Sequence, residues 1–162
     1  MADDALIALA AEVGASLKQR GWMLALAESC TGGGIAEAIT AVPGSSAWFD
    51  RGFVTYSNAS KIDMLGVQSE TLDAHGAVSR EVVLQMAQGA LRNSQAQVSI
   101  AVSGIAGPDG GTPEKPVGTV WLAWAVEDGE MLSECHRFDG SRREVRYQSA
   151  LVALERLLAV LR

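Results

Sequence analysis

The sequence holds little cysteine and little histidine, with two of each among 162 residues. Cys30 and Cys135 are far apart, and His75 and His136 do not add the close spacing of zinc ligands. The sequence therefore predicts no structural or catalytic metal and leaves open only a loosely held magnesium. With no export signal, the two thiols are expected to be reduced, as in the cytosol.

The sequence also lacks an export signal, a membrane-spanning run and an excess of positive charge. Asp3 and Asp4 occupy the place of a basic n-region, so no secretory signal is expected, and no apolar run is long enough to span a bilayer. The formal net charge of −6 argues against a nucleic-acid surface, which needs a basic face. We therefore expect a cytoplasmic protein with no membrane partner, no nucleic-acid partner and no cofactor.

Positive charge is present but unevenly spread. Four arginines fall within ten residues near the C-terminus, namely Arg137, Arg142, Arg143 and Arg146. A local basic patch on an acidic protein suits a small anionic ligand better than a polyanion. The alternative is that these arginines line the solvated face of a helix.

Hydrophobic periodicity and turn signals divide the chain into helices and strands. Helices are expected at 3–20, 32–40, 58–65, 79–91 and from 141 to the end, with a short turn of helix at 69–75. Strands are expected at 22–27, 49–56, 98–102, 117–126 and 131–138. Ser57, Ser79 and Ser141 are the expected N-caps of three helices. This order predicts one α/β domain over residues 1–162, a three-layer α/β/α arrangement with a mixed sheet and an antiparallel hairpin near the C-terminus.

Two glycine-rich turns dominate the sequence. The first glycine turn covers residues 27–34 and the second covers residues 103–111, and each follows a short apolar run. Glycines at strand ends let bare backbone N–H groups face a ligand, a geometry that suits an anion or a developing oxyanion. Because the ligand crevice of an open α/β sheet lies beyond the strand carboxyl ends, the two turns predict an active site there.

Three residues are candidates for a nucleophile. Ser29 lies between an expected strand and an expected helix, where a tight turn would hold its hydroxyl near the N–H groups of residues 31–33. A helix N-cap is the alternative role for Ser29 or Thr31. Ser46, after a Pro-Gly turn, is the rival serine, with capping or turn structure as its alternative. Cys30 is the rival thiol, because a helix N-terminus lowers a thiol pKa.

Lys61 is the best candidate for a base, since neither histidine belongs to a recognisable triad. Lysine is neutral in roughly 1 of 2,500 molecules at pH 7, and a depression of about three pKa units lies within the range that enzymes reach. Tyr56 precedes Lys61 by five residues and would pass the proton or orient the amine. Glu28 would act as acid, base or acceptor for a substrate ribose. The alternative for Lys61 is an exposed helix lysine.

The second glycine turn matches neither a Walker A motif nor a dinucleotide fingerprint. Lys115 follows it and adds a cation at its rim. A phosphate cradle at Ser103, Gly104 and Gly107 is one interpretation, and a plain loop is the other.

Five ordered motifs together resemble the CinA C-terminal domain family. They are AESCTGG at 27–33, PGSS at 43–46, YSN at 56–58 with Lys61, GAVS at 76–79, and GIAGP at 104–108 with KPVGT at 115–119. The resemblance covers essentially the whole chain. Many members carry an additional N-terminal domain, so this chain resembles the stand-alone form.

The resemblance implies a nicotinamide-mononucleotide amidohydrolase of pyridine nucleotide salvage, which releases nicotinate mononucleotide and ammonia. It also implies a serine and lysine pair, assigned here to Ser29 and Lys61 with Tyr56 as helper and Ser46 in reserve. The expected substrate contacts are Glu28, Thr31, Gly32, Gly33, Ser103, Gly104, Gly107, Lys115 and Arg142.

The substrate phosphate would lie against the second glycine turn or against the helix start at Arg142 and Arg143, within one subunit or across the interface of a homo-oligomer. The alternative functions are a non-catalytic nucleotide-binding module and a thiol amidohydrolase that uses Cys30.

Overall fold

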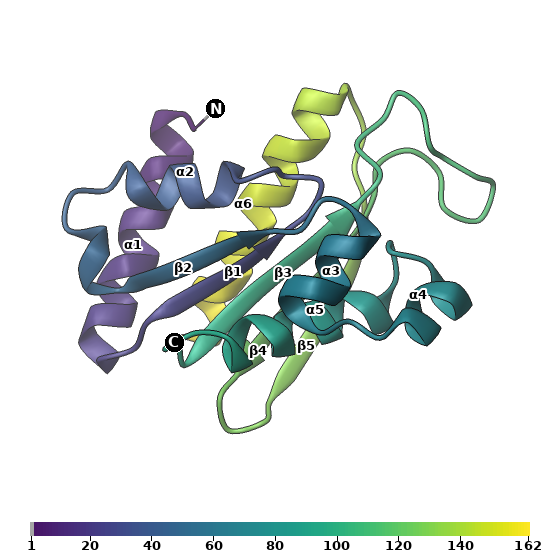
Figure 1. The fold of residues 1–162 in the computed structure, drawn as a ribbon. Coiled ribbons are helices and arrows are strands. Elements are labelled where there is room, and N and C mark those ends of the chain that lie inside the picture. Colours follow the sequence, from purple (N-terminus) through teal and green to yellow (C-terminus); the bar gives the residue numbers. More distant parts are fainter. Residues whose placement is uncertain (1) are drawn as a thin grey trace.

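The computed structural model describes residues 2–162, and its centre is a five-stranded sheet in the order β2-β1-β3-β4-β5 (Figure 1). The strands β1 (Leu24–Glu28), β2 (Phe49–Val54) and β3 (Val98–Gly104) run parallel to one another. The strand β4 (Thr119–Val126) is antiparallel to β3 and forms a hairpin with β5 (Met131–Arg137). The predicted mixed sheet with a hairpin near the C-terminus is confirmed.

Helices cover both faces of this sheet (Figure 1). On one face α1 (Asp4–Arg20), α2 (Gly34–Thr40) and α6 (Arg142–Val160) pack against one another. On the other face lie α3 (Asn58–Leu65), α4 (Ser69–His75) and α5 (Arg80–Arg92), with α5 against β1, β3 and β4. The predicted three-layer α/β/α arrangement is therefore confirmed.

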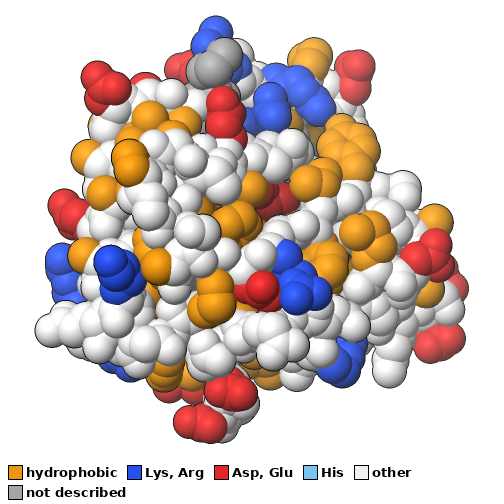
Figure 2. Space-filling model, turned by 60° about the vertical axis from the view of Figure 1, so that its left-hand side comes forward, with side chains coloured by type: hydrophobic (Ala, Val, Ile, Leu, Met, Phe, Trp, Pro, Cys, Tyr) orange, Lys and Arg blue, Asp and Glu red, His pale blue; other side chains and the backbone are white. Residues whose placement is uncertain are grey.

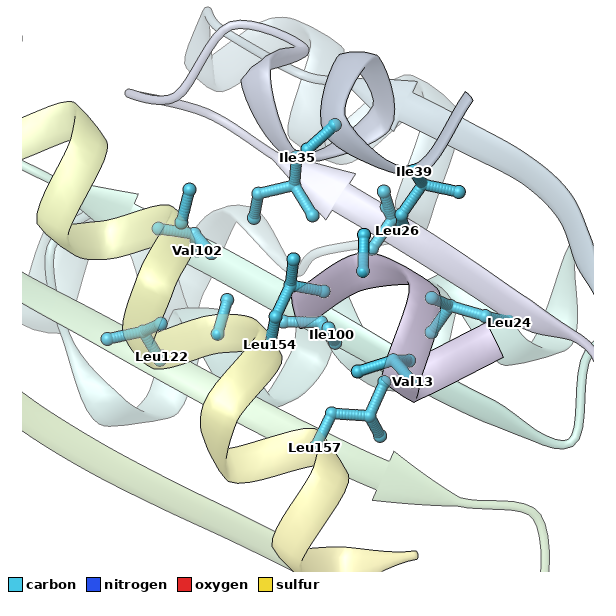
Figure 3. Packing of buried hydrophobic residues seen from close by; sticks show 14 of the residues in the cluster. Val13, Leu24, Leu26, Ile35, Ile39, Ile100, Val102, Leu122, Leu154 and Leu157 are labelled. Atoms are coloured by element: carbon cyan, nitrogen blue, oxygen red, sulfur yellow. The ribbon is translucent and has the colours of Figure 1, made fainter. Parts of the chain in front are cut away.

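Large aliphatic side chains fill the layer between the sheet and α1, α2 and α6 (Figure 3). The labelled members of this cluster are Val13, Leu24, Leu26, Ile35, Ile39, Ile100, Val102, Leu122, Leu154 and Leu157. Full burial of each such side chain is worth about 1.5–3 kcal/mol. This layer therefore holds α2 and α6 firmly over the carboxyl ends of β1 and β3.

The opposite layer is built from small side chains, largely alanine, on β1, β3 and β4. Ser99 Oγ donates a hydrogen bond to the Ala87 carbonyl of α5 at 2.8 Å. At Gly89 of α5, any β-carbon would collide with the Leu65 carbonyl of α3. Small residues thus let α5 and α3 approach closely, which brings α3 and its lysine to the edge of the sheet.

The expected helix caps are present. Ser57 Oγ accepts from the backbone N–H of Ser60 at 3.1 Å, and Ser79 caps α5 in the same way. Ser141 and Glu144 form a complete capping box at the start of α6. These local signals fix the first residues of three helices, as the sequence predicts.

Some boundaries differ from the prediction. α2 begins at Gly34 and not at residue 32, because Gly32 and Gly33 have φ angles of +57° and +97°, outside the right-handed helical region. β1 continues through Glu28, and β2 ends at Val54, before the expected residue 56. The short helix expected at 69–75 is present with those bounds, as the seven-residue α4.

The carboxyl ends of β1, β2 and β3 meet at one edge of the sheet. The Ser29 N–H donates to the Val102 carbonyl at 3.0 Å, and the Thr55 N–H donates to the Glu28 carbonyl at 2.8 Å. The strands therefore stay joined up to the point where their turns begin, at the edge where open α/β sheets bind ligands. Among residues 2–162, no helix is long and apolar enough to cross a membrane.

Candidate active site

Ser29 and Lys61 meet at this edge of the sheet. Lys61 Nζ, from α3, lies 3.0 Å from Ser29 Oγ, which the first glycine turn carries. Lys61 is 1% exposed and Ser29 is 7% exposed. Lys61 is therefore not the exposed helix lysine that the sequence left as an alternative, and the pair is shielded from bulk water.

Two backbone carbonyls fix the amine of Lys61. Nζ donates to the carbonyl of Thr55 at 2.8 Å and to the carbonyl of Tyr56 at 3.2 Å. Because carbonyls only accept, a neutral amine can donate to both and use its lone pair for the Ser29 hydroxyl. Burial lowers the pKa of Lys61 below its ordinary 10.5, while Cys30 raises it in part. The site therefore favours a lysine that can take a proton from Ser29.

The backbone of the first glycine turn closes on itself. The Gly32 N–H donates to the Ser29 carbonyl at 3.0 Å, and the Gly34 N–H donates to the Thr31 carbonyl at 2.9 Å. The Gly32 N–H, which was expected to contact the substrate, thus already has an acceptor within the turn. The Gly33 N–H has no acceptor among residues 2–162.

Glu28 holds the start of α2. Its carboxylate accepts from the N–H groups of Ile35 and Ala36, each at 3.0 Å, and from the Thr31 hydroxyl at 2.6 Å. A carboxylate is stabilised there by the free N–H groups and the helix dipole. Glu28 and Thr31 were expected to contact the substrate. Each is only 1% exposed, so their side chains stabilise the turn instead.

The side chain of Cys30 lies in the hydrophobic core and is 5% exposed. Burial raises the pKa of its thiol to about 11, and the negative charge of Glu28 adds to the rise. The expectation of a lowered thiol pKa is therefore wrong, because the buried side chain packs in an apolar cluster that disfavours the thiolate. A thiol that stays protonated at neutral pH is a poor nucleophile.

Ser46 lies in the 3₁₀ turn η1 (Ser45–Ala47) and is exposed. This turn leads into Phe49, which pairs with Leu24 at the amino end of β1, whereas Ser29 follows the carboxyl end. The length of β1 separates the two serines, roughly 15 Å at the rise of an extended strand. The structure therefore does not bring Ser46 to Lys61.

Tyr56 contributes to the site in two ways. Its carbonyl holds the amine of Lys61, while its phenol accepts from Arg142 Nη2 at 3.1 Å. Arg142 Nη1 also donates to the carbonyl of Gly107 in the second glycine turn, at 2.8 Å. Tyr56 thus orients the amine through its backbone, and its 61% exposed side chain stands at the rim with Arg142.

A cavity of about 270 Å³ opens beside the serine and lysine pair. Of the expected site residues, it is lined by Ser29, Tyr56, Lys61, Ser103, Gly104, Gly107 and Arg142. On the face shown in Figure 2, basic side chains gather in small groups among acidic and apolar ones and form no continuous basic surface. The cavity combines apolar and polar lining residues, as small-molecule sites do, and its volume lies near the lower end of such sites.

Two expected contacts in the second glycine region have structural partners. Ser103 Oγ donates to the Ala77 carbonyl at 2.9 Å, which fastens residues 76–79 to β3. Lys115 Nζ donates to the His75 carbonyl at 2.7 Å, which ties the loop after β3 to the end of α4. Lys115 is not among the residues that line the cavity.

Sequence reasoning placed Arg146 only within the basic patch near the C-terminus and gave no role to Asn58 or Asp109. Arg146 Nε and Nη2 donate to the carbonyls of Cys30 and Thr31, each at 3.1 Å. The signal was available for this residue, because Arg142 and Arg146 are four positions apart on α6 and so share a helix face. Asn58 and Asp109 line the cavity, but nothing in their local sequence distinguishes them from loop residues.

Fold and site together define a three-layer α/β protein with a buried serine and lysine pair at the carboxyl edge of its sheet. The chain belongs to the CinA C-terminal domain family, whose model matches residues 6–161. The nicotinamide-nucleotide amidohydrolase PncC of Enterobacter agglomerans is 55% identical over 158 residues, 98% of this chain and 96% of that protein. PncC of Escherichia coli K12 is 54% identical over 157 residues, 97% and 95% of the two chains.

Solved structures agree with this placement. The competence/damage inducible protein CihA from Agrobacterium tumefaciens has a TM-score of 0.97 and 48% identity, and the match covers 100% of this chain and 99% of that one. A CinA superfamily protein from Klebsiella pneumoniae has a TM-score of 0.93 and 40% identity, over 96% and 97% of the two chains.

Proposed function

We propose that this chain hydrolyses the carboxamide of nicotinamide mononucleotide to nicotinate mononucleotide and ammonia. Its relatives at 54–55% identity are named nicotinamide-nucleotide amidohydrolases, so the chain is an amidohydrolase. The observation that supports a serine and lysine mechanism is the 3.0 Å contact between the buried Lys61 Nζ and Ser29 Oγ beside the cavity.

The first step is attack of Ser29 on the amide. Ser29 Oγ forms a bond to the carbonyl carbon while its proton passes to the neutral amine of Lys61. The carbonyl π electrons move to oxygen, and the oxyanion is stabilised by backbone N–H groups of the first glycine turn. The carbonyls of Thr55 and Tyr56 keep the lysine nitrogen in place and stabilise its positive charge.

The second step releases ammonia. The proton on Lys61 passes to the amide nitrogen as the carbon–nitrogen bond breaks and leaves an ester on Ser29. Water then attacks this ester, Lys61 takes one proton of the water, and that proton returns to Ser29 as the carbon–oxygen ester bond breaks. The acid is released, and both residues regain their starting states.

Arg142 is the cation proposed to bind the substrate phosphate. Its guanidinium lines the cavity and already bridges Tyr56 and Gly107, so it is held at the rim. Arginine binds phosphate through a planar set of donors. The N–H groups of the second glycine turn supply further donors beside it. A homo-oligomer, a cytoplasmic location, one domain over 1–162 and the absence of a cofactor stay predictions.

The decisive experiment is an ammonia-release assay on nicotinamide mononucleotide, with glutamine and nicotinamide as controls. We expect one ammonia and one nicotinate mononucleotide per substrate and no release from either control. A chain that binds the mononucleotide but releases no ammonia would be the non-catalytic binding module and would refute the proposed activity.

A further inference from the structure

Two successive backbone N–H groups of the first glycine turn lack acceptors. Within residues 2–162, the N–H groups of Cys30 and Thr31 donate to no backbone carbonyl. They directly follow Ser29, where a strained turn after a nucleophile places oxyanion donors in other hydrolases. Successive free N–H groups also form a concave site for a negative charge.

Each of these N–H groups belongs to a peptide unit whose carbonyl is fixed. The Ser29 carbonyl, in the same unit as the Cys30 N–H, accepts from the Gly32 N–H at 3.0 Å. The Cys30 carbonyl, in the same unit as the Thr31 N–H, accepts from Arg146 Nε at 3.1 Å. In a trans peptide the N–H and C=O point in opposite directions. Fixing each carbonyl therefore also fixes the direction of the N–H.

Arg146 approaches the turn from the side away from the lysine. A second hollow of about 480 Å³ is lined by Arg146, Thr31 and Gly34, whereas Ser29, Cys30 and Lys61 line the cavity. The turn thus separates two concave regions. Because the Cys30 carbonyl is directed to Arg146, the Thr31 N–H is directed away from it.

We propose that Arg146 is a positioning residue that holds the Cys30–Thr31 peptide so that the Thr31 N–H serves as an oxyanion donor beside the Cys30 N–H. This inference rests on the proposed function. The guanidinium binds two successive carbonyls, of Cys30 and Thr31, which sets the plane of the peptide and not merely its position. The positive charge of Arg146 also reaches residue 30, where it lowers the pKa of the thiol in part.

Gly32 gives the turn its shape beside the arginine. Its φ of +57° is a backbone conformation that side chains other than glycine rarely adopt, and a β-carbon there would stand in ordinary contact with Arg146 Nη2, at 3.4 Å. The guanidinium therefore lies directly against the turn whose carbonyls it binds.

The test compares Arg146→Lys and Arg146→Ala with Arg156→Lys and Arg156→Ala in the ammonia-release assay on nicotinamide mononucleotide. Arg156 lies on the same helix but pairs with Glu134 of β5 at 2.8 Å, away from the turn. Loss of one oxyanion donor costs about 10²- to 10³-fold in kcat. We expect both Arg146 variants to lose about 10²-fold in kcat and in kcat/KM, with KM and the Kd of nicotinate mononucleotide unchanged. The Arg156 variants are expected to match the wild type.

Chemical rescue separates positioning from general destabilisation. Guanidinium ion at non-denaturing concentration should restore part of the kcat of Arg146→Ala, while ammonium should not, because only the planar ion can bridge both carbonyls. Thermal unfolding identifies any variant that fails to fold, and Arg146→Lys is then the deciding variant. A wild-type kcat in Arg146→Lys, or a loss confined to KM, would overturn this inference alone. A wild type that releases no ammonia would overturn the proposed function, and this inference with it.

Discussion

The two glycine-rich turns leave adjacent strands at the same edge of the sheet, but they are held differently. In the first glycine turn, N–H groups of Ser29, Gly32 and Gly34 all bind backbone carbonyls, and Glu28 binds the start of α2. The second glycine turn belongs to the longer, mostly exposed loop 105–118, which the backbone fixes mainly at its base. The backbone of the first turn is therefore held by many hydrogen bonds and can fix the positions of individual groups. The second turn is held at its base and forms one side of the cavity.

One helix serves both turns. Arg142 and Arg146 are one helical turn apart on α6, and each donates to backbone carbonyls, Arg142 to the second glycine turn and Arg146 to the first. We infer that the first turn serves the chemical step and that the second serves substrate binding, although both have similar sequence patterns. Changes in the first turn should reduce kcat, and changes at the second should raise KM.

The largest expected effect belongs to the first turn. Ser29→Ala removes the oxygen that we propose attacks the amide, and Lys61→Met removes the amine that lies 3.0 Å from it. Each should lower kcat for nicotinamide mononucleotide by several orders of magnitude, because a nucleophile and its base act as a unit. Ammonia release measures the loss, and circular dichroism confirms the fold.

Two matched variants make this prediction specific. Ser46→Ala and Cys30→Ala should each retain kcat within about tenfold, since Ser46 stands at the other end of β1 and the Cys30 thiol is buried and protonated. An inactive Ser46→Ala beside an active Ser29→Ala would reassign the nucleophile. An inactive, folded Cys30→Ala would favour the thiol mechanism.

A smaller effect is expected at the second turn. Arg142→Ala should raise KM for nicotinamide mononucleotide by about ten- to a hundredfold, the value of one charge-assisted hydrogen bond, with little change in kcat. Nicotinamide riboside, which lacks the phosphate, should show no such increase. Steady-state kinetics with both substrates measures the difference.

Arg143→Ala is the neighbouring comparison. Arg143 lines the hollow behind the first glycine turn and not the cavity, so its variant should keep the wild-type KM. If Arg143→Ala raised KM for the mononucleotide and Arg142→Ala did not, the phosphate would bind on the other side of the turn and the comparison would fail.

Much of the fold follows from local signals in the sequence. Apolar periodicity places the helices and strands, and Ser57, Ser79 and Ser141 mark three helix starts. The start of α2 was placed too early because positive φ angles at Gly32 and Gly33 depend on how the turn packs. Neighbouring contacts, which the sequence does not state, decide such boundaries.

The site was predictable only in part, for the same reason. Ser29 and Lys61 are brought together by strand order, and their residue types indicated the pairing. Glu28 was expected to meet a substrate, but its carboxylate accepts from two N–H groups at the start of α2 and from the Thr31 hydroxyl, and the fold decides this pairing. The sequence placed Arg146 in a basic patch and on the helix face of Arg142, but its contacts with the carbonyls of Cys30 and Thr31 depend on the direction of the backbone, which the sequence does not state.

The smallest expected effect is on the free energy of unfolding, which should depend on pH because the Lys61 amine is buried beside the first turn. Burial lowers the pKa of Lys61 in the folded chain below 10.5, so between that lowered pKa and 10.5 the unfolded chain binds more protons. The free energy of unfolding of the wild type, relative to Lys61→Met, should therefore rise with pH across this window and be flat below it. Each unit by which the pKa is lowered is worth about 1.4 kcal/mol.

Urea unfolding at a series of pH values measures this dependence, and Arg156→Met is the control because a guanidinium keeps its charge throughout. In the active enzyme the same proton must leave Lys61, so kcat/KM should rise with pH and reach its plateau below 10.5. The pH at which the stability difference begins to rise should match the midpoint of the kcat/KM profile, since both report the pKa of Lys61 in the free folded enzyme. A stability difference that is flat across the window would show that the first turn does not favour the neutral amine, and the contrast between the two turns would then rest on geometry alone.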